Sequence, residues 1–261
     1  MTKTLGIAFG GSGAQGIASI AYIKALEALE IKPDIVAGAG IGAVVAAMYA
    51  AGMTSQNMID FLNEVNFPGS KRPININKVK DAKYGILDGM GLEEYYQMVV
   101  PIKVFDRLYF PLNIVAANCA TGEEVIFNHG DVGRAVRSAV AIPGVFSPHE
   151  VDGTLLMDGS CINPVPFDTI RDECDVLVCL DPQINESKEN IVPYVFPMLM
   201  NASDASKKAL VVEKLRTCKV NLFERIIVED VSMFDFALFN DIIASAEEKA
   251  GEFSLRLKDL L

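Results

Sequence analysis

The sequence contains only two histidines among 261 residues, and this scarcity limits the hydrolytic mechanisms that it can support. A Ser-His-Asp triad of the α/β-hydrolase type places its histidine last in the chain, and nothing after His149 qualifies. The pattern around His129 predicts a surface turn, and His149, between Pro148 and Glu150, is predicted to lie in a loop. A carboxylate is therefore the remaining candidate for a general base, and Asp158 is the one we select.

Positive charge is also scarce. The chain has 23 Lys and Arg residues against 34 Asp and Glu residues, which gives a formal net charge of -11. A phosphate backbone is repelled by such a surface, so no nucleic-acid partner is expected. The same charge argues against tight non-specific docking on anionic membranes.

Cysteine pairs with metal-ligand or redox spacing are missing, because none of the five cysteines forms a CxxC motif. The N-terminus, Met1 to Thr4, runs straight into an apolar strand pattern and has neither the charged nor the apolar region of a signal peptide. We therefore expect reduced thiols in a cytoplasmic protein, with no metal and no cofactor. The cysteines are Cys119, Cys161, Cys174, Cys179 and Cys218.

One uncharged segment, Ile35 to Met53, has the length of a membrane span. Glycines at positions 38, 40, 42 and 52 and a strand-like beginning favour a buried strand, a turn and a helix instead. We therefore expect no transmembrane segment.

The first fifty residues alternate between strands, glycine turns and helices. Strands are expected at Thr4 to Phe9 and Asp34 to Ala37, and a largely buried helix at Ile17 to Leu29. This order predicts an α/β fold with a mostly parallel central sheet. Because ligands bind beyond the carboxyl ends of such strands, the two glycine turns that follow them are expected to meet at one crevice.

The rest of the chain shows no repeat, low-complexity tract or linker, so residues 1–261 are predicted to form a single domain. Its motif blocks fall within residues 5–182, and a helical portion is expected at about 200–261. Further strands are expected at Pro111 to Asn118, Glu123 to Phe127 and Asp175 to Leu180. Further helices are expected to start near Thr54 and to cover Leu92 to Val99, Val132 to Ala141, Asn201 to Thr217 and Asn240 to Leu261.

The first glycine turn contains Gly11-Ser12-Gly13-Ala14-Gln15-Gly16, which matches the dinucleotide pattern G-x-G-x-x-G. A dinucleotide site also needs an acidic residue at the end of the second strand, and Asp34 lies at its beginning. An oxyanion hole formed by backbone N–H groups is the alternative use of such a loop. A plain strand–helix turn without a ligand is the third reading.

The second glycine turn is laid out as a nucleophile elbow, a tight turn between a strand and a helix that presents one catalytic side chain. The elbow pattern is Gly-x-Ser-x-Gly, whereas this sequence has Gly38-Ala39-Gly40-Ile41-Gly42. Glycine therefore occupies the nucleophile position. Asp158-Gly159-Ser160 follows a short apolar run further along, and on its own it indicates only a turn.

Together these segments resemble the patatin-like phospholipases. That family has a G-G-G-x-R-G oxyanion loop, a G-x-S-x-G elbow and a D-G-G or D-G-A base motif, matched here by Gly11–Gly16, Gly38–Gly42 and Asp158–Ser160. Arg137 to Pro148 resembles a fourth family block, R-x-S-x-A-I-P-x-x-F-x-P. The resemblance implies a three-layer α/β/α patatin-like fold and a serine–aspartate dyad without histidine. It also implies an oxyanion hole at Gly11, Ser12 and Gly13, and an elbow framed by Gly38 and Gly42.

Four positions depart from the family pattern. Ser12 and Gln15 replace a glycine and the arginine of the oxyanion loop, and Ser160 replaces the last residue of the base motif. Gly40 replaces the nucleophile, so we expect no serine-hydrolase activity from this sequence. Ser12, Ser138 and Ser160 are possible substitutes by motif, but none lies on an elbow.

The resemblance implies a lipid acyl ester as the ligand of this site. Two functions follow from it. One is a patatin-like acyl hydrolase of the phospholipase A type that lacks its nucleophile, with Asp158 as its base. The alternative is a non-catalytic member that binds an acyl lipid or a protein partner in the former active-site crevice.

Overall fold

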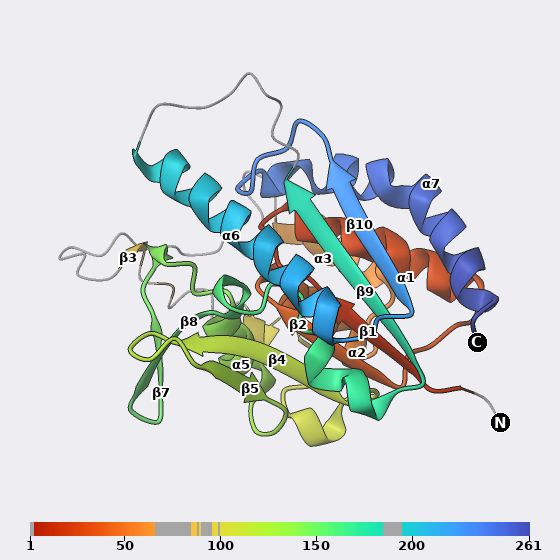
Figure 1. The fold of residues 1–261 in the computed structure, drawn as a ribbon, viewed down its shortest axis with the longest axis horizontal. Helices are drawn as coiled ribbons and strands as arrows, with labels where there is room; N and C mark the ends of the chain where they lie inside the picture. The colour runs from red at the N-terminus through yellow and green to blue at the C-terminus, as the bar shows by residue number, and fades with distance from the viewer. Residues whose placement is uncertain (1–2, 66–84, 88, 90–95, 99, 185–194) are drawn as a thin grey trace.

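A computed structural model describes residues 3–65, 85–87, 89, 96–98, 100–184 and 195–261. Within these residues an eight-stranded sheet runs in the order β10-β9-β1-β2-β4-β8-β7, with β5 also paired to β4 (Figure 1). Strands β10, β9, β1, β2 and β4 are parallel, whereas β5, β7 and β8 form antiparallel pairs at the β4 end. The predicted α/β/α architecture is confirmed, with a parallel centre and an antiparallel side.

The strands of this sheet are β1 (Leu5–Phe9), β2 (Ile35–Ala39), β4 (Leu112–Asn118), β5 (Glu124–Phe127), β7 (His149–Val151), β8 (Thr154–Asp158), β9 (Val176–Ile184) and β10 (Leu222–Val228). A separate pair contains β3 (Gly85–Leu87) and β6 (Gly144–Phe146). The α-helices are α1 (Ser19–Ala28), α2 (Ile41–Ala50), α3 (Ser55–Val65), α5 (Val132–Ala139), α6 (Val195–Thr217) and α7 (Phe239–Lys258). The 3-10 helices are η1 (Gln15–Ala18), η2 (Phe105–Arg107), η3 (Gly159–Cys161), η4 (Phe167–Glu173) and η5 (Phe236–Leu238).

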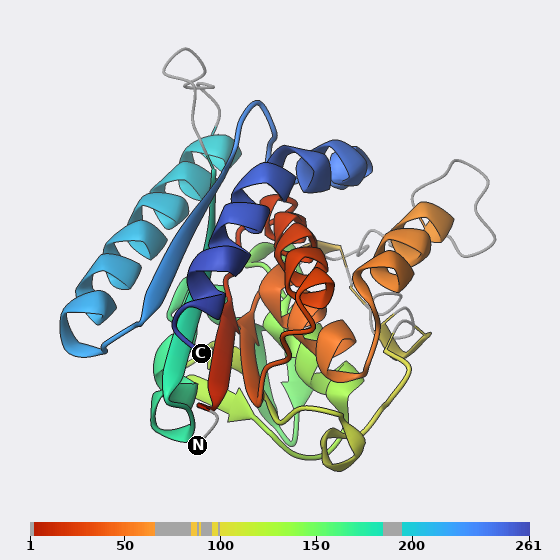
Figure 2. The ribbon, with the colours of Figure 1, turned by 90° about the vertical axis from the view of Figure 1, so that its right-hand side faces the viewer.

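The two faces of the sheet are covered by different helices. Alternate β1 side chains, Leu5, Ile7 and Phe9, enter the larger core with α1, α2, α5 and α7. Ala8 enters the smaller core on the other face, where η4 and α6 lie. Figures 1 and 2 show α6 on one side of the sheet and α1 and α7 on the other.

Strand β4 determines where Asp158 lies. Its residues Leu112 to Val115 pair with β2, and its residues Ala116 to Asn118 pair with β8. Because β5 pairs with residues of both stretches, β2 and β8 must share the opposite edge of β4. Strand β8 therefore continues along β4 where β2 ends, and this brings Asp158 next to the turn that follows β2.

Most predicted elements are confirmed within a few residues. The uncharged segment Ile35 to Met53 contains β2 and α2, which are buried in the core. No helix among the described residues is both long and apolar enough to cross a membrane. The loop expected at Phe67 to Pro73 and most of the helix expected at Leu92 to Val99 lie outside the described residues.

Two predictions are corrected. His149, expected in a loop, begins strand β7 and pairs with Leu156. The C-terminal portion is not purely helical, because β10 lies between α6 and α7 and pairs with β9.

Candidate active site

The second glycine turn has the backbone of a strained elbow. Gly40 lies between β2 and α2 with φ 54° and ψ -134°, a conformation that side-chain-bearing residues rarely adopt. A Cβ on Gly38 would collide with the backbone of Gly42 and Ala43. A Cβ on Gly42 would collide with the Phe9 and Gly10 carbonyl oxygens. Both framing glycines are thus required by the close approach of β1, β2 and α2.

Three predicted motifs meet at position 40. A Cβ placed on Gly40 would lie 3.2 Å from Gly11 Cα, 3.4 Å from Asp158 Oδ1 and 3.5 Å from Ser160 Cβ. These residues come from the oxyanion loop and the base motif, which are about 150 positions apart in the sequence. The expected meeting of the two glycine turns is therefore observed, and Asp158 joins them.

Backbone groups that are distant in the sequence hold the oxyanion loop in place. The Gly11 N–H donates to Pro164 O at 3.0 Å, and the Ala14 N–H donates to Met233 O at 2.9 Å. Between them, the N–H groups of Ser12 and Gly13 have no acceptor among the described residues. Gly13 has a positive φ of 56°. This backbone conformation allows the successive N–H groups of Ser12 and Gly13 to face the same anion. In this conformation the donors available to an anion are those of Ser12 and Gly13, and the Gly11 N–H is already used.

Gln15, which stands where the family has arginine, helps to hold this loop. It is fully buried, and its side-chain amide donates to Val231 O. The segment after β10 thus carries acceptors for both Ala14 and Gln15. The C-terminal third of the chain therefore shapes the oxyanion loop.

Asp158 is a buried carboxylate at the end of β8, 4% exposed. Its Oδ1 accepts the backbone N–H of Ser160 at 2.8 Å. Burial raises the pKa of Asp158, while the charge of Lys207 and hydrogen bonds from the Ser160 backbone and side chain act in the opposite direction. A carboxyl group with a raised pKa is a better proton acceptor than an exposed aspartate.

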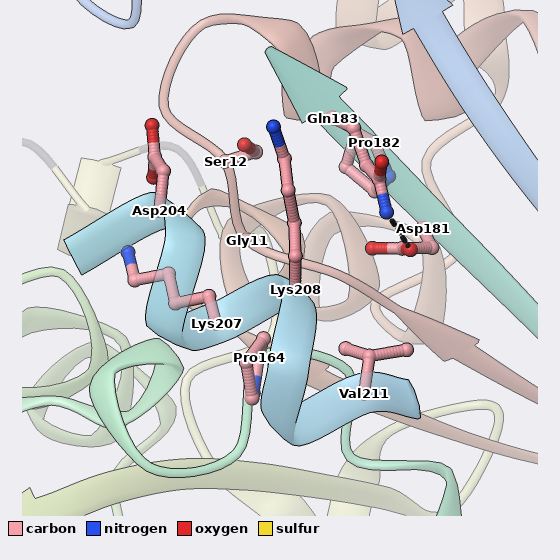
Figure 3. Close-up of a pocket in the computed structure, with 10 residues that line it drawn as sticks. All are labelled: Gly11, Ser12, Pro164, Asp181, Pro182, Gln183, Asp204, Lys207, Lys208 and Val211. Carbon is pink, nitrogen blue, oxygen red and sulfur yellow. Dashed lines mark hydrogen bonds between the residues drawn. The ribbon is translucent and has the colours of Figure 1, made fainter. Parts of the chain in front are cut away.

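A crevice opens beside the oxyanion loop (Figure 3). Gly11 and Ser12 form one wall, Asp181 to Gln183 at the end of β9 form another, and α6 contributes Lys207 and Lys208. Burial raises the pKa of Asp181 to about 6, against the opposing effects of its hydrogen bond from Gln183 and of the charges of Arg225 and Lys208. The crevice therefore combines backbone donors, two lysines and a carboxyl group.

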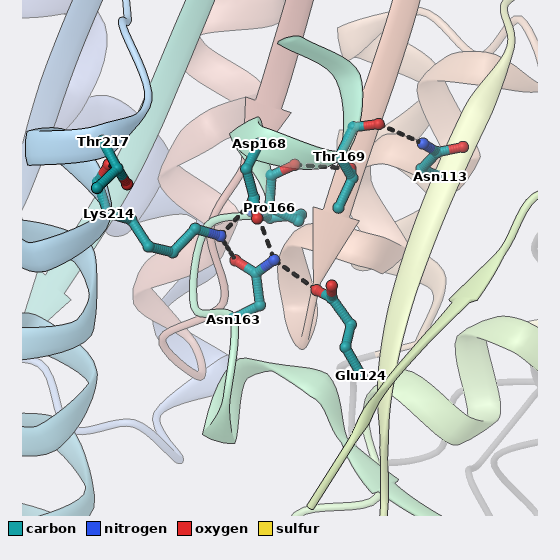
Figure 4. Close-up of polar contacts among 8 residues, drawn as sticks. All are labelled: Asn113, Glu124, Asn163, Pro166, Asp168, Thr169, Lys214 and Thr217. Carbon is teal, nitrogen blue, oxygen red and sulfur yellow. Dashed lines mark hydrogen bonds and ion pairs between the residues drawn. The ribbon is translucent and has the colours of Figure 1, made fainter. Parts of the chain in front are cut away.

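The helix over this crevice is attached by a polar network near its C-terminal end (Figure 4). Lys214 of α6 donates to Asn163 Oδ1 and to Asp168 Oδ1. Asn163 also donates to Asp168 at 3.1 Å and to Glu124 of β5. The network ties α6 to η4 and to β5, and this fixes Lys207 near the site.

Other predicted residues lie away from position 40. The Ser138 hydroxyl contacts Arg134 O and His149 Nδ1, each at 2.9 Å. His129 is exposed and contacts Asn128, as expected for a surface turn. Arg137 is buried, and it donates to Gly89 O and Ser147 O. The fourth motif block therefore stabilises loops.

Sequence reasoning did not select Lys207 or Asp181, because neither lies in a recognisable motif. Lys207 approaches the site only through the placement of α6, and Asp181 only through the pairing of β9 with β1. Among the described residues, no group of three or more His, Cys, Asp or Glu side chains is arranged to hold a metal ion.

Residues 7–170 match the family model described as patatin-like phospholipase. The chain belongs to the patatin-like phospholipase family. The matched region includes the oxyanion loop, the elbow and Asp158, and it ends before β9. Membership supports a lineage of lipid acyl hydrolases for this patatin-like chain.

Individual relatives agree with this assignment. An uncharacterized NTE family protein of Mycobacterium bovis is 34% identical over 163 residues, which cover 62% of this chain and 44% of the relative. The mouse patatin-like phospholipase domain-containing protein 6 is 28% identical over 178 residues, or 65% of this chain and 13% of the relative. The patatin-like chain thus spans less than half the length of these relatives.

The fold is also shared with VipD from Legionella pneumophila. The two structures have a TM-score of 0.53 at 15% sequence identity, covering 98% of this chain and 66% of the VipD chain. At that identity the likeness shows a common fold.

Proposed function

We propose that this chain carries a patatin-type site for lipid acyl esters, with Asp158 as general base and the Ser12 and Gly13 N–H groups as oxyanion donors. The observation that carries the proposal is the distance of 3.4 Å between Asp158 Oδ1 and a Cβ at position 40. A hydroxyl on that carbon is within hydrogen-bond reach of the carboxylate. Gly40 supplies no hydroxyl, so the elbow itself cannot be acylated.

The chemistry that this frame supports is acyl transfer. A hydroxyl at position 40 attacks the ester carbonyl carbon and passes its proton to Asp158. Two backbone N–H groups then stabilise the oxyanion, a contribution that is typically about 10²–10³-fold in rate for each donor. Without a nucleophile, binding and oxyanion stabilisation leave only about 10³–10⁴-fold acceleration over water.

A second candidate function is binding without catalysis. Gly40 favours it directly, because glycine fits the strained elbow and removes the reactive group. The crevice beside Ser12 and Lys207 then serves to hold an acyl lipid or a protein partner. The two candidates differ in whether any hydroxyl in the site can be acylated.

The proposed frame is tested by restoring the hydroxyl. We expect G40S to react with a fluorophosphonate, and peptide mapping should locate the label at position 40. The double variant G40S/D158N should lose this label, because the base is gone. G40S/D172N, which alters an exposed aspartate of η4, is the matched control and should label like G40S. A folded G40S that stays unlabelled at position 40 contradicts the proposed frame.

A further inference from the structure

Ser160 lies beside the position that a serine at residue 40 would occupy. Its Cβ is 3.5 Å from the position that a Cβ on Gly40 would take, and its side chain is 1% exposed. The Ser160 side chain also lowers the pKa of the Asp158 carboxyl, against the effect of burial. A hydroxyl beside both position 40 and the base has the placement of a nucleophile that the base can activate.

The turn at Asp158 does not need this hydroxyl. The backbone N–H of Ser160 makes the 2.8 Å bond to Asp158 Oδ1 that caps η3, and any residue but proline supplies that group. The family pattern has glycine or alanine at this position, which also indicates that the turn forms without a hydroxyl. The hydroxyl is thus additional to the family's base motif, and it occurs in a chain that has glycine at position 40.

The neighbouring candidates are less suited to nucleophilic attack. The Ser138 hydroxyl contacts Arg134 O and His149 Nδ1, whereas Ser160 Cβ is among the atoms nearest to a Cβ at position 40. Burial and the charge of Asp158 raise the pKa of Cys161 to about 12, so its thiol stays protonated near neutral pH. Ser12 lines the crevice, where its backbone N–H is a proposed oxyanion donor.

We propose that Ser160 is the nucleophile of this site and forms a dyad with Asp158 in place of the elbow serine. The inference rests on the proposed function, because it uses the same base and the same oxyanion donors. It replaces the expectation of an inactive site, which set Ser160 aside because it does not lie on an elbow. Gly11 lines the crevice and has its Cα 3.2 Å from the Cβ position at residue 40, so the crevice adjoins the point that Ser160 Cβ approaches to 3.5 Å.

The reaction balances with water as the second reactant. Ser160 Oγ bonds to the ester carbonyl carbon, its proton moves to Asp158, and the carbonyl oxygen becomes an oxyanion near the Ser12 and Gly13 N–H groups. The oxyanion collapses, the bond to the alcohol oxygen breaks, and the alcohol leaves with the proton from Asp158. Water then attacks the acyl-serine, gives a proton to Asp158 and releases the acid, and Ser160 regains that proton.

The decisive sample is the unchanged protein, reacted with a fluorophosphonate and mapped by peptide mass spectrometry. We expect one label per chain, on the peptide that contains Ser160. S160A should label at least about 10³-fold more slowly. S245A, which alters an exposed serine of α7, is the matched control and should label at the unchanged rate.

The double variant G40S/S160A separates the two proposals. If it labels at position 40 while the unchanged protein does not label at Ser160, the Ser160 inference is wrong and the proposed frame stands. If neither protein labels and both have a native circular dichroism spectrum, the proposed function is wrong as well. Labelling of the unchanged protein at a serine other than Ser160 also overturns the inference.

Discussion

Gly40 occupies a backbone conformation that imposes a cost on any side chain. Its φ of 54° and the 3.2 Å approach of Gly11 Cα predict that G40A lowers the free energy of unfolding by about 1–3 kcal/mol. The control is G251A in α7, where φ is not positive and the added Cβ meets no atom within 4 Å. That change should stabilise by about 0.5–1 kcal/mol through helix propensity. Urea unfolding measures the free energy of unfolding of both variants. If G40A is as stable as the unchanged protein, the prediction of backbone strain at position 40 is wrong.

The titration of Asp181 makes the free energy of unfolding depend on pH. Burial raises its pKa to about 6, above the value of about 3.9 in an unfolded chain. Its contribution to stability is therefore complete below about pH 4 and is lost as the pH rises through 6. We expect D181N to be more stable than the unchanged protein at pH 7, by up to about 3 kcal/mol, and equal to it near pH 4.

Urea unfolding across this pH range measures the difference. The control is D175N, for which the expected change in stability has the opposite sign. Hydrogen bonds from the Thr4 backbone and hydroxyl lower the pKa of Asp175, so D175N should destabilise the protein at pH 7. A D181N effect that is independent of pH would exclude Asp181 as the titrating group.

At the scale of elements, Lys214 links α6 to the polar network beside the crevice. K214M removes the donor to Asn163 and Asp168, and we expect it to cost about 1.5–3 kcal/mol and to increase proteolysis within α6. The control, K24M, breaks the exposed pair with Glu247, whose side chains are 54% and 47% exposed, and should cost less than about 1 kcal/mol. Equal effects of the two variants would show that the network does not hold α6.

At the scale of the whole molecule, the region that matches the family model lacks parts of its own core. β1 pairs with β9 on the edge opposite β2, and Tyr22 of α1 packs on Phe253 of α7 with ring centroids 5.2 Å apart. We therefore predict that residues 1–173 alone show no cooperative thermal transition, whereas residues 1–261 unfold in one transition as a single domain. Cooperative unfolding of residues 1–173 would contradict this prediction, because it would show that the matched region folds without β9 and α7.

The local sequence pattern predicted the central strands of the sheet correctly but did not predict the strands at the two ends of the strand order. β1, β2 and the stretch Val176 to Leu180 of β9 are buried on both faces, so each appears in the sequence as a continuous apolar run. β10 carries Glu224 and Arg225 and lies at the end of the strand order, where one edge is unpaired within this sheet. An edge strand with charged residues lacks the apolar run, and β10 was missed for that reason.

The sequence by itself determined the parallel α/β centre, the two glycine turns and the absence of a hydroxyl at position 40, because each depends on residues close together in the chain. Only the tertiary structure decided what surrounds that position. The pairing of β8 with β4 brings Asp158 to 3.4 Å from a Cβ at position 40 and Ser160 to 3.5 Å. Pro164 O accepts the Gly11 N–H, and among the described residues the N–H groups of Ser12 and Gly13 have no acceptor. These contacts join residues more than a hundred positions apart, and no local pattern encodes which of them meet.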